Sequence, residues 1–222
     1  MDVIFMLTRY DETVEDCLDV WAAVEGLGLT HAGFKDVGVQ PAVLAELNRR
    51  MQANGVITCL EVVSTTPDER MRSARIAVEL GVDWLMGGND LDDIPALLAG
   101  TGIAYLPFPG VPIGHPTVLG GSAETIEAHC KTFEAAGCAG VDLLAYRALD
   151  ADPIDLVRAA RRGTTGTLVV AGSVSTTSQI EELRDCGVDA FTIGSAIFDG
   201  SFSLRKGLTT SQLRDVVEAA RG

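Results

Sequence analysis

Short apolar runs alternate with longer segments of helical periodicity along the whole chain, and this alternation restricts the fold more than any other feature. It is typical of βαβ units, whose strands lie parallel in one sheet. About eight units can be counted, with predicted strands at 3–8, 30–34, 56–62, 84–86, 103–107, 143–146, 168–171 and 190–193. We therefore expect an α/β fold, a single (β/α)8 TIM barrel over residues 1–222, in which outer helices surround a parallel eight-stranded barrel.

The tripeptide Gly-Val-Asp recurs between a predicted helix and a predicted strand, at 81–83, 140–142 and 187–189. A glycine at this place commonly ends a helix. An open doubly wound sheet would produce the same repeat, but a count of about eight units favours a closed barrel. The aspartates lie where strands begin, at the barrel face that usually serves stability, so we expect them to be structural and not part of the site.

The charge of the chain restricts its partners. Its 17 basic and 31 acidic residues give a formal net charge of -14, which repels nucleic acid and anionic membranes. No apolar stretch reaches the roughly 18 residues of a membrane span, and no basic signal-peptide region precedes the first apolar run. The five cysteines form no Cys-x-x-Cys pair and indicate reduced thiols. We expect a cytoplasmic protein that binds neither nucleic acid nor a membrane. A homo-oligomer is compatible with the sequence.

The last two predicted strands both end in the dipeptide Gly-Ser, at Gly172-Ser173 and Gly194-Ser195. Glycine lets the backbone approach a ligand closely, and serine offers an N–H and a hydroxyl where a helix can begin. One such dipeptide alone is more often an ordinary tight turn. Two of them on adjacent strands predict a cradle for an anion.

The segment from Leu168 to Phe198 resembles the C-terminal signature of the ribulose-phosphate-binding barrel superfamily, a group of phosphate-binding TIM barrels that includes sugar-phosphate epimerases, isomerases, aldolases and decarboxylases. Elsewhere the resemblance is architectural, and no single family is matched. It implies a phosphorylated small-molecule substrate whose phosphate contacts both Gly-Ser dipeptides. A flavin phosphate can dock at the same place, but a chain this short leaves little room around the flavin ring.

Lys35 follows the second predicted strand and Glu61 ends the third, so adjacent strands would bring the two side chains together. A lysine and a carboxylate in a partly dry pocket can divide acid and base roles, which suits an isomerase or epimerase that moves a proton next to a carbonyl. Lys35 could instead form a Schiff base, as in an aldolase or decarboxylase, which are lyases. The sequence is also compatible with a purely structural Lys35–Glu61 ion pair and with a non-catalytic barrel that binds a phosphometabolite.

Four further side chains follow predicted strands. Arg9 and Arg147 are candidate ligands for a phosphate or carboxylate, and the amide of Asn89 is a candidate partner for a hydroxyl or an oxyanion. Asp11 is expected to cap the helix that follows strand one.

A loop rich in proline and glycine, 107–116, follows the fifth predicted strand, and we expect it to act as a lid. His115 is its titratable residue and a candidate general acid or base. Motifs for serine hydrolysis, zinc proteolysis and nucleotide phosphoryl transfer are absent from the sequence. We expect no cofactor, with Mg²⁺ bound through Glu61 and Asn89 as the alternative.

Overall fold

Parallel strands form the central sheet of the computed structural model, which describes residues 1–62, 64 and 66–222. The strands within these residues are β1 (Asp2–Met6), β4 (His31–Phe34), β5 (Ile57–Val62), β6 (Trp84–Gly87), β7 (Ala104–Leu106), β10 (Gly140–Leu143), β11 (Thr167–Val170) and β12 (Ala190–Ile193). Their order is β10-β11-β12-β1-β4-β5-β6-β7. The two ends of the sheet meet, because the N–H groups of Ala139 and Asp142 donate to the carbonyls of Tyr105 and Pro107, each at 3.0 Å. The predicted TIM barrel is confirmed.

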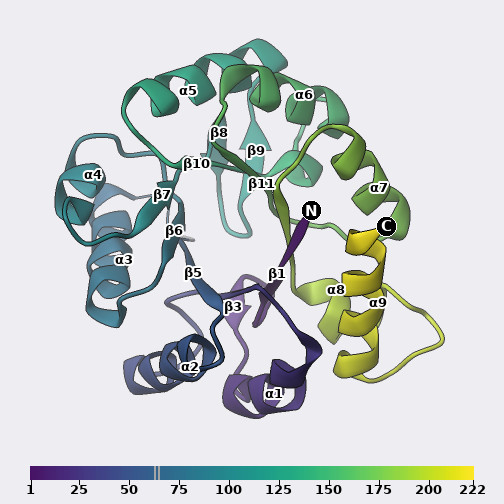
Figure 1. Cartoon of the computed structure of the whole chain (residues 1–222). Helices are drawn as coiled ribbons and strands as arrows, with labels where there is room; N and C mark the ends of the chain where they lie inside the picture. The colour runs from purple at the N-terminus through teal and green to yellow at the C-terminus, as the bar shows by residue number, and fades with distance from the viewer. Residues whose placement is uncertain (63, 65) are drawn as a thin grey trace.

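Helices surround the strands on the outside (Figure 1). The described residues form α1 (Cys17–Val24), α2 (Pro41–Ala53), α3 (Pro67–Leu80), α4 (Asp93–Leu98), α5 (Ala123–Ala135), α6 (Pro153–Gly163), α7 (Thr177–Asp185), α8 (Ser195–Phe198) and α9 (Thr209–Arg221), with the 3-10 turns η1 (Glu25–Leu27) and η2 (Ala145–Arg147). Local chemistry sets the helix starts: the Asp152 carboxylate accepts from the N–H groups of Ile154 and Asp155, and Pro153 is the first residue of α6.

Two antiparallel hairpins lie outside the barrel sheet. One joins β2 (Thr8–Arg9) to β3 (Glu12–Thr13) directly after β1, and the other joins β8 (Val111–Ile113) to β9 (Val118–Gly120) after β7. The second hairpin occupies the loop that the sequence predicted as a lid.

The core has two layers because successive strand side chains point to opposite faces. Outward-facing residues such as Phe5 and Phe34 pack with helix residues such as Trp21. The barrel interior holds a separate cluster of Ile4, Met6, Cys59, Met86, Leu106, Val169 and Ala190. This cluster fills the barrel, and a site must therefore lie above it, at the carboxyl ends of the strands.

The bounds of the sixth barrel strand differ from the prediction of 143–146, since β10 is Gly140–Leu143. Helix α5 is followed by Gly137, whose φ of 83° matches the φ of 65° at Gly81 and of 73° at Gly187. These are the left-handed positions that favour glycine. Gly140 does not have a positive φ. The helix-ending glycine before β10 is therefore Gly137, not Gly140.

The backbone hydrogen bonds also show that β10 begins before the Asp of its tripeptide. The N–H of Asp83 donates to Thr58 and that of Asp189 donates to Leu168, each as the first bond to the preceding strand. Before β10 this bond comes from Ala139. The expectation that all three aspartates of the repeat occupy strand starts is therefore wrong for Asp142, which lies inside its strand.

Gly140 gives a test of this close packing. A Cβ at Gly140 would collide with the backbone carbonyl of Thr167 on β11, whereas a Cβ at Gly26 would meet nothing within 4 Å. We expect Gly140→Ala to lower the free energy of unfolding by roughly 1–3 kcal/mol, measured by urea denaturation. Gly26→Ala is the matched control and should leave stability unchanged or slightly higher. Equal effects of the two changes would contradict the observed pairing of β10 with β11.

Candidate active site

A cavity of about 250 Å³ opens at the carboxyl ends of the strands. Five charged side chains line it, namely Asp11, Lys35, Glu61, Arg147 and Asp199. The rest of the lining comes mainly from the turns 172–175 after β11 and 192–196 at the end of β12. Both Gly-Ser dipeptides and the predicted Lys35 and Glu61 thus share one pocket.

Lys35 lies between two carboxylates. Its Nζ is 2.8 Å from Asp11 Oδ1 and 3.1 Å from Glu61 Oε2, and all three side chains are at most 8% exposed. Opposite charges at these distances stabilise the ammonium form of lysine. The Lys35 backbone is fixed as well, since its N–H donates to Thr13 Oγ1 at 2.9 Å and its carbonyl accepts from the same hydroxyl at 2.7 Å.

Asp11 connects the lysine to Arg147. The guanidinium donates to both carboxylate oxygens of Asp11, at 2.9 and 3.0 Å, and also to the carbonyl of Thr117 at 3.2 Å, in the turn of the β8–β9 hairpin. Burial alone would raise the pKa of Asp11, but the hydrogen bonds and charges of Arg147 and Lys35 outweigh it and hold that pKa well below its ordinary value. Asp11 is therefore ionised at neutral pH.

The expected helix-capping role of Asp11 is wrong. Helix α1 begins at Cys17, and Asp11 lies in the β2–β3 turn with a φ of 63°. Its position directly after the first predicted strand was the available signal for a site residue. The intervening hairpin, which moves the helix start away from Asp11, gave no clear pattern in the sequence.

Asp142 is a second residue that the sequence analysis did not place at the site. Its side chain is fully buried, and among the described residues neither of its carboxyl oxygens has a hydrogen-bond partner. Burial raises the pKa of Asp142 well above its ordinary value, the charge of Glu61 adds to this, and the charges of Lys35 and Arg147 oppose it. Burial and the charge of Glu61 thus favour the neutral form of Asp142.

The two Gly-Ser turns have backbones that other residues would not fit. Gly172 and Ser173 have φ angles of 78° and 63°. A Cβ at Gly172 would lie 2.6 Å from Arg147 Nε, and a Cβ at Gly194 would lie 2.7 Å from the Thr8 carbonyl oxygen. Because neighbouring atoms come this close to the backbone, glycine is required at both positions.

The residues after these glycines leave backbone donors open to the cavity. The N–H groups of Ser173 and Val174, and those of Ser195 and Ala196, donate no hydrogen bond to any described residue. All four residues line the cavity. Unpaired N–H groups gathered in one pocket can bind an anion such as a phosphate.

The remaining candidate residues lie outside the cavity lining. Arg9 is exposed and pairs with Asp199 at 2.6 Å, Asn89 is exposed after β6, and His115 is exposed in the β8–β9 hairpin. Of the predicted anion ligands among the arginines, the structure brings only Arg147 to the pocket. The roles predicted for Arg9, Asn89 and His115 therefore have no support from the geometry.

The described residues contain no group of three or more His, Cys, Asp or Glu side chains arranged to hold a metal ion. In the same part of the chain, no helix combines the length and apolarity needed to cross a membrane.

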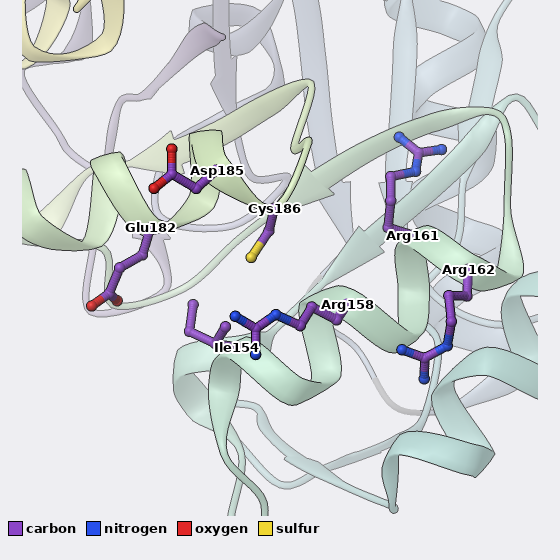
Figure 2. A pocket seen from close by; sticks show the side chains of 7 residues that line it. All are labelled: Ile154, Arg158, Arg161, Arg162, Glu182, Asp185 and Cys186. Atoms are coloured by element: carbon purple, nitrogen blue, oxygen red, sulfur yellow. The ribbon is translucent and has the colours of Figure 1, made fainter.

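A second cavity, of about 560 Å³, lies between α6 and α7 on the outside of the barrel. Figure 2 shows Arg158, Arg161 and Arg162 along α6, and of the three Arg158 extends toward α7. All three arginines form ion pairs: Arg158 with Asp155 at 3.6 Å, Arg161 with Asp189 at 3.0 Å and Arg162 with Glu127 at 2.9 Å. This groove lies away from the strand ends and holds none of the predicted site residues.

The Asp11 network gives a pH-dependent prediction. Asparagine tolerates a positive φ, so Asp11→Asn should keep the backbone and remove only the charge. We expect a loss of roughly 3 kcal/mol in unfolding free energy at pH 7. Because the folded-state pKa of Asp11 is lowered, its contribution is present above the unfolded pKa of about 4 and is lost as the pH falls below it.

Urea denaturation at a series of pH values measures this effect. Asp199→Asn, which removes the exposed pair with Arg9, is the matched control and should cost less than about 1 kcal/mol at every pH. A loss in Asp11→Asn that does not shrink at low pH would show that the charge of Asp11 is not the cause.

Comparisons with solved structures show what the fold resembles. The A-subunit of tryptophan synthase from Pyrococcus furiosus matches with a TM-score of 0.69 at 15% identity, over 100% of this chain and 97% of the other. An N-acetylmannosamine-6-phosphate 2-epimerase from Clostridium perfringens matches with a TM-score of 0.65 at 10% identity, over 98% and 92%. A thiamine phosphate pyrophosphorylase from Pyrococcus furiosus matches with a TM-score of 0.65 at 15% identity, over 100% and 97%.

No protein-family model matches the chain, and no curated protein matches its sequence. The identities to the three structures are low, so the likeness is one of fold. Within that limit, the chain shares the (β/α)8 barrel architecture of these structures.

Proposed function

We propose that this protein is an enzyme that moves a proton next to the carbonyl group of a phosphorylated small metabolite, as isomerases and epimerases do. The observation that carries the proposal is the single cavity in which Lys35 and Glu61 lie 3.1 Å apart and onto which both Gly-Ser turns open. An acid–base pair and an anion cradle in one pocket are what such a reaction needs.

The phosphate is assigned to the two turns. Their unpaired N–H groups supply attraction locally, which a chain with a net charge of -14 requires. A cavity of about 250 Å³ suits a small phosphate ester better than a dinucleotide or flavin. Two of the structural neighbours are named for phosphorylated compounds, N-acetylmannosamine 6-phosphate and thiamine phosphate.

The charged residues of the pocket have different roles in the proposed reaction. Glu61 takes the proton from the carbon next to the carbonyl, and the Lys35 ammonium donates a hydrogen bond to the carbonyl oxygen as negative charge develops there. Glu61 then returns the proton to the neighbouring carbon or, after the planar intermediate has turned over in the pocket, to the other face of the first carbon. Asp11 holds Lys35 in place and balances its charge, and Arg147 in turn holds Asp11.

A lyase reaction through a Schiff base on Lys35 is the weaker alternative. Attack on a carbonyl requires the neutral amine. Lys35 is instead held in two ion pairs, with Asp11 at 2.8 Å and with Glu61 at 3.1 Å. The same contacts make Lys35 a better proton donor than nucleophile.

A thermal-shift screen tests the phosphate site. We expect stabilisation by certain sugar phosphates or sugar-acid phosphates and none by their unphosphorylated counterparts. An ester at 100 times its dissociation constant should add about 2.7 kcal/mol. Ser173→Asp should abolish the shift, because the new carboxylate repels the phosphate. Asparagine has the size of aspartate and tolerates a positive φ equally well but carries no charge, so Ser173→Asn should retain more of the shift. No shift with any ester would mean that the Gly-Ser dipeptides are ordinary turns.

Variants of the acid–base pair test the reaction. With an ester found by the screen, Lys35→Met and Glu61→Gln should each lower the rate by about 10²–10⁴ and retain most of the ester's affinity. In deuterium oxide the wild type should exchange a carbon-bound proton, followed by NMR. Lys206→Met, at an exposed lysine outside the cavity, is the control and should leave the rate unchanged.

Unchanged rates in both pocket variants would favour a protein that binds the ester without turning it over. Borohydride added during turnover distinguishes the lyase: a covalent mass on Lys35 would contradict the proton-transfer assignment.

A further inference from the structure

Asp142 is a buried ionisable group that the proposed reaction does not use. Its strand register pairs it with Val169, which belongs to the cluster inside the barrel, so the Asp142 side chain projects inward from β10. The residue is 0% exposed, and neither carboxyl oxygen accepts a hydrogen bond from any described residue. A buried ionised carboxylate without a partner is strongly unfavourable.

The charged groups that act on Asp142 come from several elements of the barrel: Glu61 on β5, Lys35 after β4, and Arg147 in η2. The two cations are already engaged, Lys35 with Asp11 and Glu61, and Arg147 with Asp11 and the Thr117 carbonyl. Two carboxylates therefore already balance two cations. An ionised Asp142 would add an unbalanced negative charge to this group.

Burial is the main cause that raises the pKa of Asp142, and the carboxylate of Glu61 raises it further. Cys59, on the same strand as Glu61, has its own pKa raised well above the ordinary value, mainly by burial. The interior below the pocket thus disfavours negative charge.

We propose that Asp142 and Glu61 are a coupled carboxyl pair that holds one proton at neutral pH, with the proton on Asp142, so that Asp142 keeps Glu61 as the anionic base of the site. Asp142 does not line the cavity, and it acts through Glu61 as a positioning residue. The neutral acid places no second negative charge beside Glu61, which stays paired with Lys35 and free to accept a proton. The role of Glu61 as base rests on the proposed function, whereas the shared proton does not.

Carbon-13 NMR of labelled aspartate side chains tests the coupling directly, without a substrate. In the wild type, the Asp142 carboxyl, assigned by its loss in Asp142→Asn, should be protonated at pH 7. In Glu61→Gln, its titration midpoint should fall by about one pH unit, because the repulsion from Glu61 is gone. If Asp142→Asn does not fold, the resonance that shifts between the wild type and Glu61→Gln supplies the assignment. An ionised Asp142 at pH 7, or a midpoint unaffected by Glu61→Gln, would overturn the proposal.

Thermal unfolding gives a second readout with a matched control. Because the folded-state pKa of Asp142 is raised, its burial costs stability as the pH rises above the unfolded value of about 4. Asp142→Asn should therefore raise Tm at pH 7, and this gain should vanish toward pH 4. Asp83→Asn changes the aspartate of the Gly-Val-Asp copy directly before β6, but Asp83 accepts from the N–H and hydroxyl of Thr58 at 2.7 and 3.1 Å, so this variant should lower Tm. Equal losses in both variants at pH 7 would contradict a neutral Asp142.

The outcomes separate the two proposals. A coupled pair in a protein that turns over no phosphate ester would leave the proton-sharing inference intact and remove the proposed function. If the protein exchanges a carbon-bound proton of the ester but its Asp142 is ionised at pH 7, the proposed function stands and the proton-sharing inference is removed.

Discussion

The buried ion network at the barrel mouth is the interaction on which the site depends. Asp11 holds Arg147 through both of its carboxylate oxygens and Lys35 through one, and Lys35 in turn contacts Glu61. These residues come from segments far apart in the sequence, and each pays a desolvation penalty that only its partners offset. Removing one member leaves another charge buried without a partner, so the network fixes the loop after β1, the end of β4 and the turn after β10 together.

The barrel provides the rigid support for this network. Apolar side chains fill its interior, and Lys35 and Glu61 project above them from adjacent strands. The turns after β11 and β12 lie on the opposite side of β1 in the strand order and carry the unpaired N–H groups. A small molecule with an anionic end and a reactive end therefore finds complementary groups at the two sides of one cavity.

Much of this could be predicted from the sequence. The alternation of strand and helix patterns predicted the barrel, and adjacency along the chain predicted that Lys35 and Glu61 would meet. Three other candidates also follow strands, namely Arg9, Asn89 and His115. A side chain at a strand end can point into the pocket or out to solvent, and a shift of one residue decides which of these it does. Pattern alone does not set that offset in a loop.

Asp11 and Asp142 were assigned to other roles for identifiable reasons. A short hairpin of two-residue strands separates Asp11 from the helix it was expected to cap. At Asp142 the tripeptide Gly-Val-Asp matches the repeat by composition, while the structural equivalent is Gly137-Cys138-Ala139. In both places the backbone conformation, which depends on tertiary hydrogen bonds, decides where the carboxylate goes.

One cavity would then hold a phosphate at the Gly-Ser turns and a reacting carbon beside Glu61. A crystal structure with a hydroxamate of a phosphorylated sugar acid, which imitates an enediolate, tests this arrangement. We expect the phosphate against the N–H groups of Ser173 and Ser195, the hydroxamate oxygen on Lys35, and Glu61 within about 3–3.5 Å of the adjacent atom. A phosphate bound instead in the groove beside Arg158, with the barrel mouth unchanged, would contradict it.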